Sequence, residues 1–339
     1  MTHVVTASEL PLLLRFLSQH LPASLKLHGE TLALLHGIDA CTSHALGDDL
    51  VMNTAGIEAL HAADAAGAID FHRVSAAVSR RHYPGTDADT DRPHLQLSFF
   101  ATDIEAATDL FAVILADLQP PPRSLMFAGL NRQFLPAARE HFGGGALGSR
   151  TDGIETRTED ANDVSHWVSP CVLLWRPPPA ARVDHSLAEA PSLDLPVPTG
   201  CTLGPLVAAD SYLVNDTWAY GKTEATRVQR VLPCIEHQLS MGLRLEETGE
   251  LVAWAIGDHP YGAIGKVFTV EAHRRKGYSA VVCAALTKLV EADAQGERPR
   301  CAAPFCFVVA DNEPSLSLFR HSLGYVEAEG SSQLDWVGF

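Results

Sequence analysis

Residues 268–279, FTVEAHRRKGYS, connect two apolar runs of different periodicity and decide the fold of the second half of the chain. The run before them, residues 263–270, favours a β-strand. The apolar spacing after them predicts a helix that continues to about residue 292. The quoted stretch is therefore a strand-to-helix junction.

The chemistry of this junction favours an anion. A helix N-terminus presents unpaired N–H groups and a partial positive charge, and Gly277 lets the backbone come close to a ligand. Arg274, Arg275 and Lys276 would add a local positive potential. The sequence thus predicts a pyrophosphate-binding turn, although the charge run alone favours a solvated basic helix start.

The residues around this junction continue an alternating pattern of strands and helices. Thr248-Gly249 is typical of a hairpin turn, Pro314 suits a first helical position, and Gly324 suits the end of a helix. The expected strands are residues 201–207, 243–246, 251–257 and 305–309, and the expected helices are residues 208–220, 223–239 and 314–323.

The first half of the chain is predicted to be a mixed α/β domain. Ser8 marks the start of a helix, and Gly29 in the middle of residues 25–35 favours a strand, a turn and a strand. Further helices are expected at residues 56–66 and 103–118, strands at residues 94–100 and 171–175, and a mobile loop at residues 142–163.

A proline-rich segment indicates where two domains meet. The chain has 339 residues, and domains commonly have about 100–200. Residues 176–200, RPPPAARVDHSLAEAPSLDLPVPTG, are too rich in proline and small residues for a regular element. We expect an N-terminal domain over residues 1–176, a linker over residues 177–200 and a catalytic domain over residues 201–339.

Composition excludes several classes of function. The 25 Lys and Arg against 41 Asp and Glu give a net charge of −16, which disfavours nucleic acid as a partner. No run approaches the roughly 18 apolar residues of a membrane span. The seven cysteines are scattered without a CxxC pair, so we expect reduced core thiols. With no HxxxH or HxE pair, no metal site is expected.

The order of these motifs resembles the GNAT acyltransferase superfamily. Its signature, Gln/Arg-x-x-Gly-x-Gly/Ala, is matched by Arg274-x-x-Gly277-x-Ser279, with serine in place of the last small residue. Residues 311–315, DNEPS, are followed by Leu-Phe and Gly-Tyr pairs, as in the superfamily's closing segment. The resemblance implies an α/β chain of two domains whose second has a GNAT fold with a mixed central sheet. A degenerate GNAT-like fold is an open alternative for the first.

The resemblance also implies a site for acyl-CoA, or coenzyme A, as co-substrate. The strand end would pair with the pantetheine arm, the basic turn would hold the pyrophosphate, and the later helix would line the far side of the CoA tunnel. In that order the cofactor-binding residues are Phe268, Thr269 and Val270; Arg274, Arg275, Lys276, Gly277, Tyr278 and Ser279; and Asn312, Ser315 and Phe319. Many GNAT enzymes have a tyrosine that acts as a general acid at the position where this chain has Phe319. For Asn312 and Ser315, a helix cap and its first turn are the alternative.

A narrower resemblance is to the glycine N-acyltransferase family. It lies in residues 21–29, LPASLKLHG, and in Val214-Asn215 with Trp218 and Gly221. It implies transfer of an acyl group from acyl-CoA to the amine of glycine or another small amino acid, with Asn215 and Trp218 shaping the acceptor pocket. A core tryptophan is the alternative for Trp218. The family suggests mitochondria, with the cytoplasm as the alternative.

The catalytic residues depart from the family pattern. Members are thought to use a glutamate as general base, but alignment on Thr269 and Gly277 puts Ala263 at that position. Asp258 and His259 are the substitutes within reach, although both also suit an ordinary turn. Val270 is the candidate N–H donor to the oxyanion.

Two other functions remain open. A peptide or protein N-acetyltransferase would suit the acidic charge, and the missing glutamate keeps a non-catalytic CoA-binding module in view.

Overall fold

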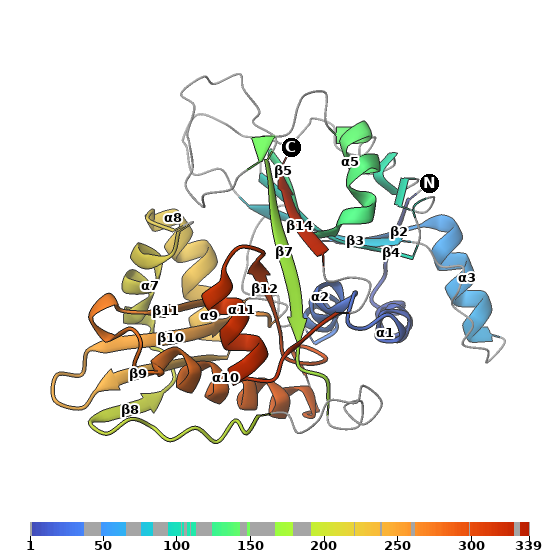
Figure 1. Ribbon diagram of the computed structural model, residues 1–339. Coiled ribbons are helices and arrows are strands. Elements are labelled where there is room, and N and C mark those ends of the chain that lie inside the picture. The colour runs from blue at the N-terminus through green and yellow to red at the C-terminus, as the bar shows by residue number, and fades with distance from the viewer. Residues whose placement is uncertain are drawn as a thin grey trace. The chain divides into compact units, whose positions relative to one another are not determined.

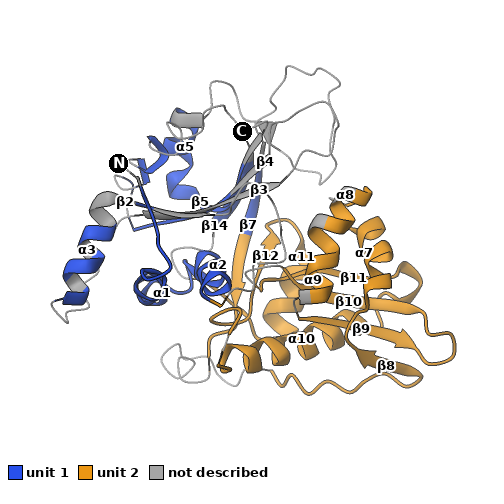
Figure 2. Cartoon of the chain, turned by 180° about the vertical axis from the view of Figure 1, so that it is seen from behind, with its two compact units in different colours: residues 1–35, 42–171, 333–339 blue, residues 36–41, 172–332 orange. Residues whose placement is uncertain are grey.

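The computed structural model describes residues 2–36, 49–65, 76–83, 94–102, 104, 107–108, 110–112, 124–142, 148–149, 167–178, 191–219, 221–237, 239–258, 262–297, 299–328 and 333–338. Two compact units divide the chain, and Figure 2 colours them separately. Unit 1 comprises residues 1–35, 42–171 and 333–339, and unit 2 comprises residues 36–41 and 172–332. The boundaries at residues 176 and 200 stay a prediction.

Unit 1 combines a mixed sheet with helices. Its strands follow the order β1-β2-β3-β4-β5-β14. In this order β4 and β5 run parallel, and every other pair of adjacent strands runs antiparallel. Its elements are β1 (Thr2–Val4), α1 (Leu10–Gln19), α2 (Leu25–Leu35), β2 (Asp49–Asn53), α3 (Thr54–Ala65), β3 (Ala76–Tyr83), β4 (His94–Ala101), β5 (Ser124–Asn131), α5 (Leu135–Phe142), β6 (Gly148–Ser149) and β14 (Gln333–Gly338). The strand β7 (Trp167–Trp175) begins in unit 1 and ends in unit 2.

Apolar clusters cover both faces of this sheet. Phe99 and Phe100 are neighbours on β4 and therefore point to opposite faces. Phe100 joins a cluster with Phe16 of α1, and Phe99 joins another with Phe111 and residues of β5. The aromatic pair Phe99-Phe100 therefore anchors two cores.

The prediction for residues 25–35 was wrong, because they form the helix α2 rather than two strands. Every residue from Leu25 to Ala33 is buried, so packing overrides the low helix propensity of Gly29. A helical signal was present in the sequence: Lys26 and Glu30 are four residues apart and form an ion pair at 3.2 Å.

Unit 2 is built on a four-stranded antiparallel sheet with the order β11-β10-β9-β8. Gly249, at φ +71°, closes the predicted hairpin between β9 and β10. The elements are β8 (Cys201–Gly204), α7 (Ser211–Thr217), α8 (Glu224–Thr226), a π-helical turn (Arg227–Val231), α9 (Leu232–His237), β9 (Ser240–Leu245), β10 (Leu251–Gly257), β11 (Ile264–Thr269), α10 (Tyr278–Ala294), β12 (Phe305–Val309), α11 (Glu313–Ser317), a second π-helical turn (Leu318–Ser322) and β13 (Val326–Glu327).

The sheet of unit 2 lies between two sets of helices. Figure 1 shows α10 along one face, and α7 and α9 along the other. Trp254 of β10 is buried among Val214 of α7 and Cys234 and Ile235 of α9. The strand β11 is an edge strand of this sheet. The strand β12 lies near β11 but pairs with β7, in the other sheet. The outer edge of β11 is therefore not paired to a strand of its own sheet.

Several other predictions concern segments with few described residues. Most of residues 103–118 and 142–163 lie outside the described residues. Residues 176–178 and 191–200 of the proline-rich segment form no helix or strand. The six cysteines that the structure describes are buried thiols, and Cys41 lies outside the described residues. In the described part of the chain, no helix has the length and apolar character needed to span a membrane.

Candidate functional site

The turn after β11 is formed by main-chain hydrogen bonds. A short 3-10 turn (Glu271–His273) follows the strand, and its last N–H donates to the carbonyl of Val270 at 2.8 Å. Arg274 then folds back, and its Nε donates to the carbonyl of Thr269 at 3.2 Å. These bonds place the following residues at the start of α10.

Residues 275–279 form a turn with open main-chain N–H groups. Within the described part of the chain, their N–H groups donate to no protein acceptor. Arg275 has φ +62° and Gly277 has φ +77°, and such left-handed residues alternating with ordinary ones make an anion-binding nest. Gly277 also occupies the N-cap position of α10, so the positive end of a 17-residue helix adds to the potential.

The side chains of this turn are positively charged and exposed. Arg274, Arg275, Lys276 and Gly277 all lie on the surface. The Lys276 Nζ is 3.4 Å from the Nδ1 of His273, and the ring of His273 stacks on that of Tyr278. The residues predicted from Arg274 to Ser279 are thus brought together around one set of open N–H groups.

The outer edge of β11 offers a further polar surface. The N–H of Val270 donates to the carbonyl of Val252 at 2.9 Å, and Thr269 is the register partner of Ala253. Because an antiparallel ladder alternates, the N–H and carbonyl of Thr269 then point away from β10. The hydroxyl of Thr269 is buried and has no partner among the described residues. The carbonyl already accepts from Arg274, so a polar ligand at this edge would satisfy the N–H and the hydroxyl of Thr269.

This arrangement corrects the expected role of Val270. Its N–H was predicted to stabilise an oxyanion, but it is already committed to the sheet. Phe268, also predicted to be in the site, turns its ring onto Trp254 at a centroid distance of 5.0 Å. The outward-facing groups belong to the alternate residues, Val267 and Thr269.

The residues on α11 and after it have different surroundings. Asn312 is exposed and caps α11, where its Oδ1 accepts a hydrogen bond from the N–H of Ser315 at 3.2 Å. Phe319 is only 3% exposed and packs edge-on against Tyr325. Phe319 therefore lies in the core, and its role in cofactor binding stays a prediction.

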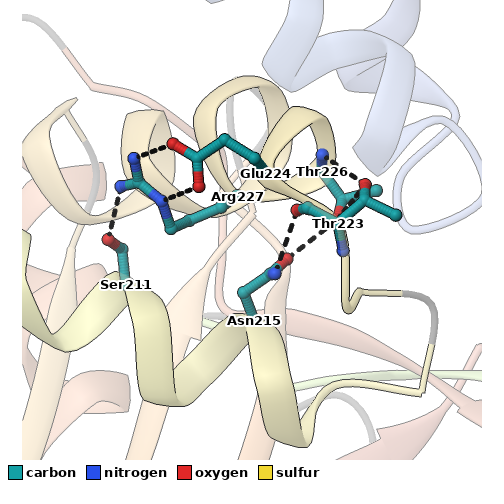
Figure 3. Close-up of polar contacts among 6 residues, drawn as sticks. All are labelled: Ser211, Asn215, Thr223, Glu224, Thr226 and Arg227. Carbon is teal, nitrogen blue, oxygen red and sulfur yellow. Dashed lines mark hydrogen bonds and ion pairs between the residues drawn. The ribbon is translucent and has the colours of Figure 1, made fainter. Parts of the chain in front are cut away.

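Asn215 stabilises a turn between α7 and α8 (Figure 3). Its Nδ2 donates to the carbonyl of Thr223 at 3.1 Å, and its Oδ1 accepts from the hydroxyl of Thr226 at 2.9 Å. Its carbonyl accepts from Lys222, and a Cβ on Gly221 would lie 2.1 Å from that oxygen. Asn215 was predicted to bind the acceptor, but its side chain is buried and engaged within this turn.

The same region fixes Arg227 and Trp218. Arg227 is paired with Glu224 and donates to the hydroxyl of Ser211 at 3.0 Å (Figure 3). Trp218 follows α7 and is half-buried against the cluster around Trp254. The turn held by Asn215 also contains the main chain of Trp218, whose carbonyl accepts from the N–H of Gly221 at 2.9 Å.

A charged cluster lies where β10 turns into β11. The Lys266 ammonium is paired with Asp258 and lies 4.8 Å from the centroid of the Trp218 ring. The N–H of Asp258 donates at 2.7 Å to the carbonyl of Ala263, the residue at the expected glutamate position. Asp258 is thus beside the position predicted to carry the base, whereas His259 lies outside the described residues.

Sequence reasoning missed Lys266. The signal was a single lysine inside the otherwise uncharged strand IGKVFT, where a buried charge requires a partner. Among the described residues, no group of three or more His, Cys, Asp or Glu side chains could hold a metal ion.

Comparisons with known proteins agree with this architecture. A family model described as FR47-like protein matches residues 240–337. No curated protein matches the chain.

Three solved structures are similar to it over nearly their whole length. A Drosophila protein is 18% identical with a TM-score of 0.66, and the match covers 100% of this chain and 98% of that one. A tandem GNAT protein from the clavulanic acid biosynthesis pathway is 14% identical with a TM-score of 0.54, over 99% and 97%. A Pyrococcus horikoshii protein provisionally described as an acetyltransferase is 9% identical with a TM-score of 0.50, over 100% and 88%.

At these identities the similarity shows the fold alone. It confirms the predicted fold class, a mixed α/β chain with a GNAT fold, and the tandem GNAT protein fits the prediction of two domains. The FR47-like match supports the same superfamily.

Proposed function

We propose that this chain is an acyl-CoA-dependent N-acyltransferase whose acceptor is the amine of a small amino acid such as glycine. The observation that carries the proposal is the turn of residues 275–279, which follows shortly after β11. Among the described residues, the N–H groups of this turn have no acceptor and the outer edge of β11 pairs with no strand. A GNAT fold supports acyl transfer in general, and the acceptor class extends that inference.

Each part of acyl-CoA has a matching surface. The diphosphate would accept hydrogen bonds from the N–H groups of residues 275–279, with Arg274, Arg275 and Lys276 supplying positive potential. A pantetheine carbonyl would accept from the outward N–H of Thr269, and the hydroxyl of Thr269 is a further partner. The thioester would then lie farther back along β11, toward Val267 and Lys266.

The reaction needs no group beyond the protein and its two substrates. The acceptor nitrogen attacks the thioester carbonyl carbon, a C–N bond forms, and the C–S bond breaks as the amide carbonyl re-forms. The outward N–H of Val267 would stabilise the oxyanion in place of that of Val270. Asp258 would take the proton lost by the amine, and the thiolate, whose thiol has an ordinary pKa of about 8.5, can leave unassisted.

A thiol-release assay tests this proposal. Acetyl-, benzoyl- and longer acyl-CoA are each incubated with glycine, other amino acids and a basic peptide. We expect thiol release that depends on an amino acid. Thiol release with the peptide alone would show that the acceptor is a peptide or protein and not a small amino acid.

A non-catalytic CoA-binding module is the second candidate. Ala263 favours it, because no carboxylate is present at the family's expected position. Tight CoA binding without turnover on any amine would establish this second function, whereas amide formation would exclude it.

A further inference from the structure

The backbone of Lys266 has an unusual conformation. Its φ is +48°, a region that a lysine rarely adopts. The pairing of β11 with β10 shifts register here, since Trp254 faces Phe268 but Ile256 faces Gly265. The extra residue makes a bulge, and bulges and strained residues are concentrated at functional sites, where they redirect side chains.

The bulge turns the lysine side chain inward. Lys266 is only 7% exposed there, and its ammonium meets groups from several elements. Asp258 pairs with it from the turn before β11, Cys234 of α9 has its sulfur at 4.0 Å, and Trp218 lies at 4.8 Å. Arg230, in the π-helical turn, is the other charged group close enough to act on it.

Lys266 nevertheless stays charged. Burial alone would lower the pKa of its ammonium, but the charge of Asp258, the Cys234 sulfur and the hydrogen bond to Asp258 together raise that pKa. The repulsion from Arg230 is the smallest of these influences. A protonated lysine is therefore fixed beside the carboxylate of Asp258.

Gly265 allows that carboxylate to lie against the strand. A Cβ on Gly265 would be 2.8 Å from the Oδ2 of Asp258, so any larger residue would push the carboxylate away. The Oδ1 of Asp258 is the atom that pairs with Lys266, and among the described residues no hydrogen bond reaches Oδ2. Asp258 is 22% exposed, so this carboxylate is reachable from outside, unlike Lys266.

We propose that Lys266 is a positioning residue for acyl transfer, which holds the Asp258 carboxylate over the bulge of β11 so that Oδ2 can take the proton of the acceptor amine. This inference rests on the proposed function. Lys266 itself touches neither substrate: the nitrogen forms its bond to the acyl carbon, its proton goes to Asp258, and the thiolate takes a proton from water.

The test compares Lys266→Met with Lys266→Arg and with Lys288→Met as a matched control. Lys288 makes a similar ion pair with Asp194, but both side chains are exposed. The rate of thiol release is measured with saturating acyl-CoA and varied acceptor, and CoA affinity is measured by calorimetry.

We expect Lys266→Met to lower kcat/KM for the acceptor by about 30-fold, which is less than the roughly 100- to 10,000-fold that a positioned base contributes, because the carboxylate itself remains. Lys266→Arg should restore the rate, because it returns a cation to Asp258, and CoA affinity and the Lys288→Met control should not change.

A second variant keeps the test decisive if Lys266→Met fails to fold. The double variant Asp258→Asn/Lys266→Met replaces the buried ion pair with neutral groups, which proteins often tolerate. It should be as slow as Asp258→Asn alone. Wild-type kcat/KM in Lys266→Met, or no recovery in Lys266→Arg, would overturn the role of Lys266. Wild-type turnover by the double variant would overturn the base role of Asp258 and, with it, the role of Lys266. Failure of the wild-type protein to turn over any amine would instead remove the proposed function together with this inference.

Discussion

Lys26 in unit 1 and Lys266 in unit 2 are both buried lysines, and their side chains have the same exposure of 7%. Lys26 lies in the regular helix α2 and pairs with Glu30, which is 1% exposed, and Ser98 donates to the same carboxylate at 2.7 Å. Lys266 lies at a left-handed bulge, and its partner Asp258 is 22% exposed.

The difference shows that burial of a charge does not by itself mark a functional site. The cluster of Lys26 joins one helix to one strand inside an apolar core, as a structural ion pair does. The pair of Lys266 combines backbone strain, an aromatic neighbour and a carboxylate that solvent can reach. These features together are the grounds on which we propose a role in acyl transfer for this pair and a structural role for the pair of Lys26.

The largest effect that sharpens this comparison is on stability. Lys26→Met should lower the free energy of unfolding by about 4 kcal/mol, because it leaves the Glu30 carboxylate buried without its cation. Urea denaturation measures the change, and acyl transfer should persist under native conditions. The exposed pair of Arg15 and Asp64 supplies the control, since Arg15→Met should cost about 0.5 kcal/mol at most. A cost for Lys26→Met as small as this would contradict a structural role.

His28 lies on the same helix as Lys26 and gives unit 1 a pH dependence. Burial lowers its pKa from 6.5 to about 4. The unfolded chain therefore binds a proton between pH 6.5 and 4 that the folded chain does not, so stability falls as the pH falls through this window. The loss should reach about 3 kcal/mol, at 1.36 kcal/mol per pKa unit.

His28→Gln tests this pH dependence. We expect it to flatten the curve of unfolding free energy against pH between pH 6.5 and 4, as measured by urea denaturation at several pH values. His321→Gln, at an exposed position, should leave the slope unchanged. An unaltered slope in His28→Gln would show that another group carries the dependence.

Asn215 extends the comparison to a buried polar group without charge. Asn215→Ala should cost about 2 kcal/mol, because it leaves buried partners in the turn unsatisfied. Through Trp218 it should also raise the KM for the acceptor, while CoA affinity stays the same. Thermal denaturation and steady-state kinetics measure the two effects. Thr217→Ala, at the end of the same helix, should change neither the stability nor the KM for the acceptor. A change in CoA affinity with Asn215→Ala would show that the acceptor and CoA surfaces are not separate.

The smallest expected effect on stability concerns the main chain. Gly277→Ala should cost about 1 kcal/mol, because alanine disfavours φ +77°. Distortion of the turn should weaken CoA binding by about tenfold, which is about 1.4 kcal/mol. Gly204→Ala is the control, since a Cβ there meets nothing within 4 Å and its φ is not positive. Equal CoA affinity in the two variants would show that the turn does not take part in CoA binding.

Much of unit 2 could be predicted because its signals are local. The strand Phe305–Val309 and the hairpin at Gly249 follow from apolar runs and turn residues. The helix α10 follows from its spacing and from Gly277 before it. The open N–H groups of the turn belong to the main chain, so the sequence motif was enough to locate them.

The rest depends on contacts that sequence spacing does not contain. The helix α2 forms because the core buries all sides of it, although Gly29 indicated a turn. Which N–H groups of β11 face outward depends on register, so Val270 was predicted as the oxyanion donor in place of Val267. Asn215 and Phe319 have residue types that suit a pocket, but packing commits one to a turn and the other to the core.

The central claim, that residues 275–279 hold the diphosphate of CoA, is tested most directly by calorimetry with two ligands. CoA and pantetheine share the arm that would pair with β11, but only CoA carries the diphosphate. We predict that CoA binds at least about 100-fold more tightly than pantetheine, or about 2.7 kcal/mol, and that added salt reduces this difference. Equal affinities for the two ligands, or no heat of binding with CoA, would contradict the account.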